Sequence, residues 1–263
     1  MNPSIIIASG ILSAALAAHA GVTITQVMKG LEGDKPPMTN IIHLEADKAR
    51  IDMGLNPGNY MIYRGDKNAF WIVDTQKKTY MVMTEKDIDA MHAKMDAMMA
   101  KLHEQMKGMP PERQKMMEEM MAKMSAGGAQ GPRTTYRKIG DGGKVEGWAT
   151  EKYEGHRDSA KVSEIWTTSP KNIGIQESDV KVLKDMAKFF QKFAKGMPDL
   201  IGNKENGLEG MPVKSIGYKD GKVRWESDLK SVKKEDLAAS LFEVPAGFAE
   251  KKMDKMERPE KPE

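Results

Sequence analysis

Four side chains of types that bind soft metals lie along one short stretch of this chain. They are His92, Met95, Met99 and His103, separated by steps of three, four and four residues. These steps place all four on neighbouring lines of one α-helix, and thioether and imidazole ligands suit copper, above all Cu(I). A straight helix spreads them over about 16 Å, so one ion reaches only adjacent members unless another segment adds ligands. Copper binding is therefore one hypothesis for this stretch.

The same stretch is rich in methionine, since 13 of the 23 methionines of the chain fall between Met81 and Met124. Its apolar side chains recur at helical steps and fall within an arc of about 100°. They are Ile88, Met91, Met95, Met98, Met99, Leu102, Met106 and Met109. Methionine repacks around varied apolar shapes, so this stripe also suits a hydrophobic ligand, a partner protein or the chain's own sheet.

Other chemistry finds little support in the sequence. There is no cysteine and no Gly-x-Ser-x-Gly motif, and the five histidines are dispersed along the chain. No glycine-rich loop precedes a helix as phosphate binding requires. The 41 basic and 38 acidic residues are finely mixed, giving a net charge of +3, which argues against a nucleic-acid-binding face. The sequence therefore predicts a protein that is not an enzyme, with no catalytic residues assigned.

The first twenty residues predict export. They carry no charged side chain, are apolar from Ile5 to Ala18, and end in the small residues of Ala18-His19-Ala20. This pattern is typical of a secretory signal peptide cleaved before Gly21, and a retained membrane anchor is the alternative. Without cysteine the chain has no disulfides and no site for bacterial lipid attachment. We expect a mature periplasmic protein without a transmembrane segment, in a Gram-negative type of envelope.

Between residues 21 and 83, short segments rich in β-branched and aromatic residues alternate with turn sequences such as Asn56-Pro57-Gly58-Asn59. This alternation predicts an antiparallel meander. At Thr84 the apolar period changes to that of a helix, with Asp87 placed to cap its start. The helix should end near Lys107, and a second one should start near Pro111, so residues 84–125 form a Met-rich helical hairpin.

Strands resume after residue 132, and a further amphipathic helix is predicted over residues 178–195. A hairpin is expected about Asp220-Gly221, followed by a helical piece over 233–242 and a strand-like segment over 244–248. The charged tail, residues 250–263, is expected to be disordered. One domain over 21–249 is preferred to two domains split near 127–132.

Several segments carry a family resemblance. They are GKVEGWATEKYEG (143–155), SEIWTT (163–168), the helix through Phe189-Phe190, GMPVKSIGYKDGKVRWESDLKSV (210–232), LFEVPAGF (241–248) and the early RIDMGLNPGNYMIYRGDKNAFWIVDTQKKTYMVM (50–83). Together they resemble an uncharacterised family of exported bacterial proteins, a domain of unknown function grouped with the LolA-like outer-membrane lipoprotein carriers. The resemblance implies a curved antiparallel β half-barrel of about eleven strands, of the α+β class, with amphipathic helices over its concave face. Carriers of this type bind acyl chains between sheet and helices.

Three functions remain open on the sequence. The first is a periplasmic carrier that holds a hydrophobic ligand, a lipid or a lipidated polypeptide, between sheet and helices. Its predicted lining is Met95, Met99, Leu102, Met106, Phe190 and Phe193. The second is the copper-binding protein described above, and the third is an envelope structural or interaction protein with no small ligand, in transient contact with a membrane or an envelope protein. A hollow apolar cavity on the concave face would favour a carrier, and a filled one a scaffold.

Overall fold

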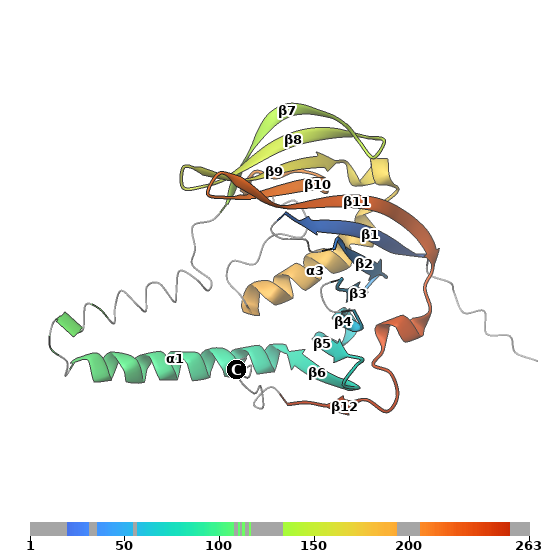
Figure 1. The fold of residues 1–263 in the computed structure, drawn as a ribbon. Helices are drawn as coiled ribbons and strands as arrows, with labels where there is room; N and C mark the ends of the chain where they lie inside the picture. Colours follow the sequence, from blue (N-terminus) through green and yellow to red (C-terminus); the bar gives the residue numbers. More distant parts are fainter. Residues whose placement is uncertain are drawn as a thin grey trace, which may run out of the picture.

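The computed structural model describes residues 20–31, 36–54, 57–107, 110, 112–113, 116, 134–193 and 206–252. The predicted signal peptide, the second predicted helix of the Met-rich hairpin and most of the predicted disordered tail lie outside the described residues. The remainder forms one open, strongly curved sheet with helices on its concave side (Figure 1).

The first half of the sheet is a meander, as the turn sequences predicted. Its strands are β1 (Ala20–Gly30), β2 (Met38–Leu44), β3 (Lys48–Asp52), β4 (Asn59–Arg64), β5 (Ala69–Asp74) and β6 (Thr79–Thr84). The second half contains β7 (Thr135–Val145), β8 (Trp148–Arg157), β9 (Ala160–Thr168), β10 (Met211–Lys219) and β11 (Lys222–Asp236). The short β12 (Ala249–Glu250) comes last in the chain but pairs with β6, at the outer edge of the first half. Every neighbouring pair is antiparallel except β12 with β6.

The two halves meet where β1 pairs with β11. In the described part of the chain the sheet has 12 strands, in the order β12-β6-β5-β4-β3-β2-β1-β11-β10-β9-β8-β7. The β1–β11 ladder runs from Ala20 opposite Asp236 to Gly30 opposite Trp225. Because this ladder places both halves in one sheet with a common concave face, the predicted class, a curved antiparallel half-barrel with helices, is confirmed.

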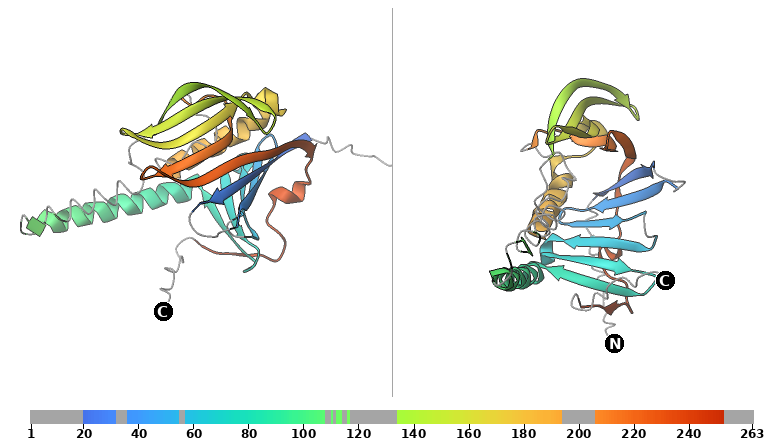
Figure 2. Two further views of the ribbon diagram at one scale, coloured as in Figure 1. Left: turned by 45° about the horizontal axis from the view of Figure 1, so that its top comes forward. Right: turned by 60° about the vertical axis from the view of Figure 1, so that its left-hand side comes forward.

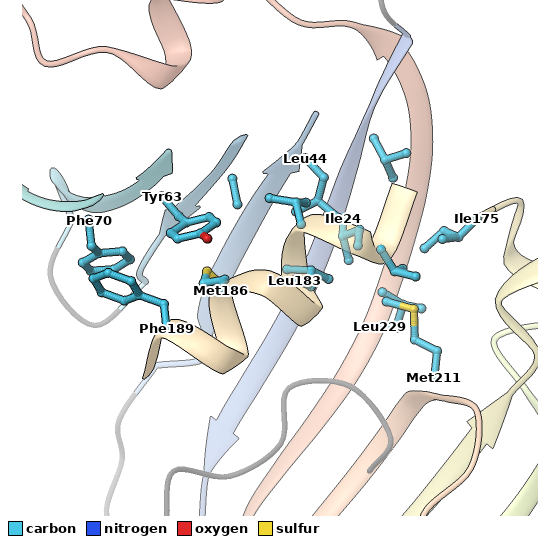
Figure 3. Packing of buried hydrophobic residues seen from close by; sticks show 14 of the residues in the cluster. Ile24, Leu44, Tyr63, Phe70, Ile175, Leu183, Met186, Phe189, Met211 and Leu229 are labelled. Atoms are coloured by element: carbon cyan, nitrogen blue, oxygen red, sulfur yellow. The ribbon is translucent and has the colours of Figure 1, made fainter. Parts of the chain in front are cut away.

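Helix α3 (Glu177–Phe193) lies across the concave face (Figures 1 and 2). Its apolar stripe is almost fully buried: Val182 is 1%, Leu183 4% and Met186 0% exposed. These side chains pack against strand residues that include Ile24 and Leu44 (Figure 3). The 3₁₀ turn η2 (Pro170–Ile173) precedes the helix and adds Ile173 to the same cluster. The concave face beneath α3 is thus filled by the protein's own side chains.

Helix α1 (Glu85–Lys107) has the bounds that the sequence predicted. The Thr84 backbone N–H donates to Asp87 Oδ2 at 2.9 Å and the Asp87 N–H donates to Thr84 Oγ1 at 3.3 Å, which forms the predicted cap. Ile88 in its first turn is 1% exposed and belongs to the core cluster under α3. Beyond that turn α1 extends away from the sheet on the side of α3 (Figures 1 and 2). Only the start of α1 is therefore anchored in the sheet's core.

The convex face of β3–β6 is covered by the segment that follows β11. Phe242, in the 3₁₀ turn η4 (Ala239–Phe242), is 1% exposed and packs with Tyr60, Ile62 and Val73. The buried Arg64 donates to Asp66 at 2.6 Å and pairs with Glu243, and these hydrogen bonds raise the pKa of Arg64. An ion pair at the edge of an apolar cluster thus fixes the position of this segment.

Two predictions for the C-terminal region were wrong. The residues 233–242 were expected to be helical, but Lys233–Asp236 continue β11 and only Ala239–Phe242 form a short 3₁₀ turn. The ladder with β1 overrides the helical propensity of Lys, Glu and Asp at those positions. The strand expected over 244–248 is displaced to Ala249–Glu250, one residue beyond the predicted domain end.

We expect Leu183→Ala to lower the free energy of unfolding by about 2–5 kcal/mol, because it leaves a cavity between α3 and the sheet. The exposed neighbour Lys184→Ala should change it by less than about 0.5 kcal/mol. Urea denaturation followed by circular dichroism measures both. Equal effects of the two substitutions would contradict the packing of α3.

A second stabilising cluster lies on β8–β10, on the face opposite to the buried Tyr153 and Ile165. Glu164 accepts hydrogen bonds from Tyr218 at 2.8 Å and Lys161 at 3.1 Å, and Lys152 lies 3.1 Å away. Burial acts to raise the pKa of Glu164, but these bonds outweigh burial and lower the pKa to about 2. The cluster therefore favours the ionised carboxylate in the folded state.

The lowered pKa of Glu164 determines how the stability of the fold depends on pH. A carboxyl whose pKa is lower in the folded than in the unfolded state stabilises the fold above about pH 4.5, and this contribution is lost as the pH falls toward 2. We expect Glu164→Gln to flatten the loss of stability between those values relative to the unchanged chain. Urea midpoints measured from pH 7 to pH 2 test this, and identical pH slopes for both proteins would refute it.

Candidate functional site

A cavity of about 540 Å³ opens beside the C-terminal half of α3, where the helix passes β4 and the start of α1. It is lined by Asp47, Tyr63, Gly65, Asp66, Asn68, Glu85, Lys181, Val182, Asp185, Lys188 and Phe189. We refer to it as the α3 cavity. Its volume lies within the range usual for small-molecule sites, which is roughly 300–1,000 Å³.

The apolar wall of the α3 cavity is formed by two aromatic rings. Tyr63 on β4 and Phe189 on α3 meet edge to face, with ring centroids 6.0 Å apart and an interplanar angle of 61°. Figure 3 shows them together with Phe70 at one end of the core cluster. Burial first, then the carboxylates of Asp185 and Glu85, raise the pKa of Tyr63, so its hydroxyl stays protonated. The wall is thus neutral and aromatic, and because Tyr63 is 4% and Phe189 3% exposed, only a small part of each ring borders the cavity.

A tight turn shapes the side of the cavity next to β4. The 3₁₀ turn η1 (Gly65–Lys67) ends at Asn68, whose backbone is left-handed with φ 45°. Asparagine tolerates this conformation better than most residues, which explains the Gly-Asp-Lys-Asn sequence here. A Cβ at Gly65 would lie 3.0 Å from the Asp47 carbonyl oxygen, so the close approach of these two segments favours glycine.

The rim of the cavity carries charges of both signs. Lys181 pairs with Asp185, and Lys188 Nζ lies 3.9 Å from the same carboxylate. Asp66 is held by Arg64 across the turn, and this hydrogen bond lowers the pKa of Asp66. An aromatic wall beneath a charged rim suits an amphipathic molecule whose apolar part enters and whose polar part stays in water.

The structure describes the side chains of only some residues of the predicted ligand lining. Met99 and Leu102 are half-buried on α1 and Met106 is 3% exposed, but none of them lines the α3 cavity. The side chains of Met95, Phe190 and Phe193 lie outside the described residues. Phe189, which the predicted lining does not include, packs in the core cluster between α3 and the sheet.

Sequence reasoning also missed the charged rim and the turn of the α3 cavity. Tyr63 is a core residue, at 4% exposed, and it also borders the cavity. The Gly65-Asp66-Lys67-Asn68 sequence indicates a turn but carries no sign of a site. Residues as far apart in sequence as Asp47 and Phe189 meet here, so no local pattern could have indicated the site.

The proposed metal ligands lie on a single helix, as expected. His92 is half-buried and His103 is exposed on α1, while the side chain of Met95 is not described. Within the described parts of the chain, His, Cys, Asp and Glu side chains form no group of three or more that could hold a metal ion. A copper site at His92, Met95, Met99 and His103 would depend on the thioethers and stays a prediction.

A second, smaller cavity of about 160 Å³ lies on the convex face, between the sheet and the segment around η4. Arg64, Trp71, Tyr80 and Phe242 are among the residues that line it. Its walls belong to the cluster that attaches the C-terminal segment, so we assign it a packing role. No helix in the described part of the chain is both long and apolar enough to span a bilayer.

These features define a curved β half-barrel whose concave face holds one buried helix and an adjoining amphipathic cavity. The model of a family described as a domain of unknown function, DUF4412, matches residues 84–248. The chain belongs to this family, as the sequence resemblance predicted. No curated protein matches it.

Solved structures with similar folds are distant. A structure of PNGF-II has a TM-score of 0.39 at 14% identity, covering 90% of this chain and 31% of its own, so this chain spans about a third of that protein. The MucA/MucB complex of Pseudomonas aeruginosa gives 0.39 at 8% identity, covering 87% of this chain and 57% of that one. A LolA superfamily protein from Nitrosomonas europaea gives 0.28 at 8% identity, covering 85% and 89% of the two chains. Likenesses this weak decide nothing about function.

The metal prediction can be tested by Cu(I) titration under reducing conditions against a competing chelator. If His92, Met95, Met99 and His103 bind copper, Met99→Ala combined with His103→Ala should weaken binding at least tenfold, because adjacent ligands are lost. His156→Ala, on β8, is the control. An affinity unchanged by the double substitution would remove the proposed site.

Proposed function

We propose that this protein is a non-enzymatic binding protein of the bacterial envelope that holds the apolar part of a lipid or lipidated polypeptide in the α3 cavity. The observation that carries the proposal is the cavity itself, about 540 Å³ with an aromatic wall and a charged rim at the end of the concave-face helix. We also propose that residues 1–20 are a signal peptide and that the mature chain is periplasmic.

The position of the cavity favours binding over pure scaffolding. The core beneath α3 is filled, which by itself favours a scaffold, and a ligand placed there would have to displace Leu183 and Met186 from the sheet. Beside Tyr63 and Phe189 no such displacement is needed, and a cavity of this volume accommodates part of an acyl chain or a comparable apolar group. The charged groups around it, which include four carboxylates and two lysines, keep the polar part of the ligand in water.

Apolar contact would supply most of the binding free energy at this site. Each methylene that leaves water contributes about 0.8 kcal/mol, so about ten buried methylenes supply the ~8 kcal/mol of micromolar binding, and more are needed to offset the entropic cost of association. The site offers no arrangement of nucleophile and base at the aromatic wall, where the apolar group would lie. Binding and release without chemical change are the activities that this arrangement supports.

Displacement of a fluorescent fatty acid from the purified protein tests the proposal. We expect Lys188→Trp, which places an indole at the cavity mouth, to weaken fatty-acid binding at least tenfold. Lys184→Trp is the matched control, because Lys184 lies on the same helix but does not line the cavity.

Lipid extraction and native mass spectrometry of protein exported in a Gram-negative host identify the natural ligand. We expect a species with an acyl chain that is absent from Lys188→Trp. The absence of any bound acyl species, together with equal probe affinity for both tryptophan variants, would reject the carrier and favour an envelope interaction protein.

A further inference from the structure

The end of the sheet formed by the β8–β9 and β10–β11 turns combines exposed apolar side chains with a strong excess of positive charge. It consists of Lys29–Leu31 at the end of β1, Arg157–Lys161 and Lys219–Trp225. We call it the basic end. In Figure 1 the two hairpin turns and the arrowhead of β1 point to the same side.

Two contacts show that the three segments are neighbours. The Leu31 backbone N–H donates to the Arg224 carbonyl oxygen at 2.8 Å, which joins the end of β1 to the β10–β11 hairpin. Lys161 Nζ lies 4.7 Å from the centre of the Tyr218 ring, which joins that hairpin to the β8–β9 turn. The basic end is thus one continuous surface.

The exposed apolar side chains of the basic end are large. Leu31 is 51%, Val223 38% and Trp225 37% exposed. Trp225 stands between Gly30 and Gly217 in the ladders, so neither cross-strand neighbour has a side chain to cover the indole. The indole lies over Gly217, where a Cβ would approach its Nε1 to 2.1 Å. Packing over the Gly217 backbone explains the position of one face of the Trp225 indole. It does not explain why Leu31 and Val223 are exposed.

The charge of this surface contrasts with the balance of the whole chain. Its basic residues are Lys29, Arg157, Lys161, Lys219, Lys222 and Arg224, and its acidic residues are Asp158 and Asp220. Among the described residues, no carboxylate pairs with the ammonium groups of Lys29, Lys219 and Lys222, whereas Lys214 pairs with Glu226 and Lys230 with Glu146. Three unpaired cations therefore lie beside the exposed apolar groups.

We propose that the basic end docks the protein on the surface of a bilayer that contains anionic phospholipid. Lysines are attracted to the negative surface potential, and an exposed tryptophan is favoured at the level of the headgroups. The apolar side chains at the turn can enter the interface without any backbone rearrangement. An acidic protein surface would match the charge but would not need three projecting apolar side chains. This docking is independent of whether the α3 cavity holds a ligand.

Binding to vesicles tests the proposal. The mature full chain should cosediment with vesicles of phosphatidylglycerol and phosphatidylcholine, and not with phosphatidylcholine alone, and the binding should weaken as salt rises. Lys29→Glu, Lys219→Glu and Lys222→Glu combined should lower partitioning at least tenfold, because each lysine near the surface adds to the attraction. The control reverses the same number of charges at exposed lysines elsewhere, Lys77, Lys171 and Lys184.

A depth measurement separates insertion from simple electrostatic attraction. Lipids brominated on the acyl chains should quench part of the tryptophan fluorescence, and Trp225→Phe should abolish that quenching while Trp148→Phe leaves it. The proposal fails if the chain binds neither vesicle, if both charge-reversal variants bind equally, or if quenching survives in Trp225→Phe. Fatty-acid displacement at the α3 cavity should be unchanged in the Lys29/Lys219/Lys222 variant, so docking and ligand binding can fail independently.

Discussion

The burial of one helix against the concave face of the sheet is the interaction on which this structure depends. An open sheet of 12 strands presents a large apolar surface that water would otherwise cover. The stripe of α3 fills that surface with Val182, Leu183 and Met186, which reach strands from both halves of the chain. The same helix brings Phe189 to Tyr63, so the packing that stabilises the curved sheet also builds the wall of the α3 cavity. Stability and the candidate site therefore have a common cause.

The two faces of the sheet are covered in different ways, and this difference explains where a ligand has room. On the convex side the C-terminal segment fits closely, with Phe242 buried and Arg64 paired to Glu243, and the gap left is small. On the concave side α3 packs on a twisted sheet and leaves space beside its C-terminal half. The larger of the two cavities lies there, where η1 and the first turn of α1 form the remaining walls.

Much of the fold could be predicted from local sequence patterns. The pairing of strands that are far apart in the sequence could not. Turn residues and alternation predicted the meander, and the Thr84–Asp87 cap with Pro110 predicted the limits of α1. The pairing of β1 with β11 joins residues about 200 positions apart, and nothing in either segment alone indicates its partner. That pairing is also why Lys233–Asp236 are a strand despite a helical composition. Phe189, which the predicted lining does not include, borders the cavity for a similar reason, because the packing of α3 on the distant strand β4 decides which of its side chains meet Tyr63.

The methionine stripe of α1 is less buried than the apolar stripe of α3. Ile88 is buried in the core, whereas Met98, less than three turns further on, is 58% exposed, and between them the helix leaves the sheet. Burial along this stripe does not simply fall with distance from the sheet, because Met106 near the end of α1 is 3% exposed, but Ile88 is the member of α1 that packs in the sheet's core cluster. The features that point to binding lie where elements pack on the sheet or end in its turns: the α3 cavity, built from β4, η1, α3 and the first turn of α1, and the basic end. Neither includes a residue of α1 beyond its first turn, so each can act independently of the projecting part of that helix.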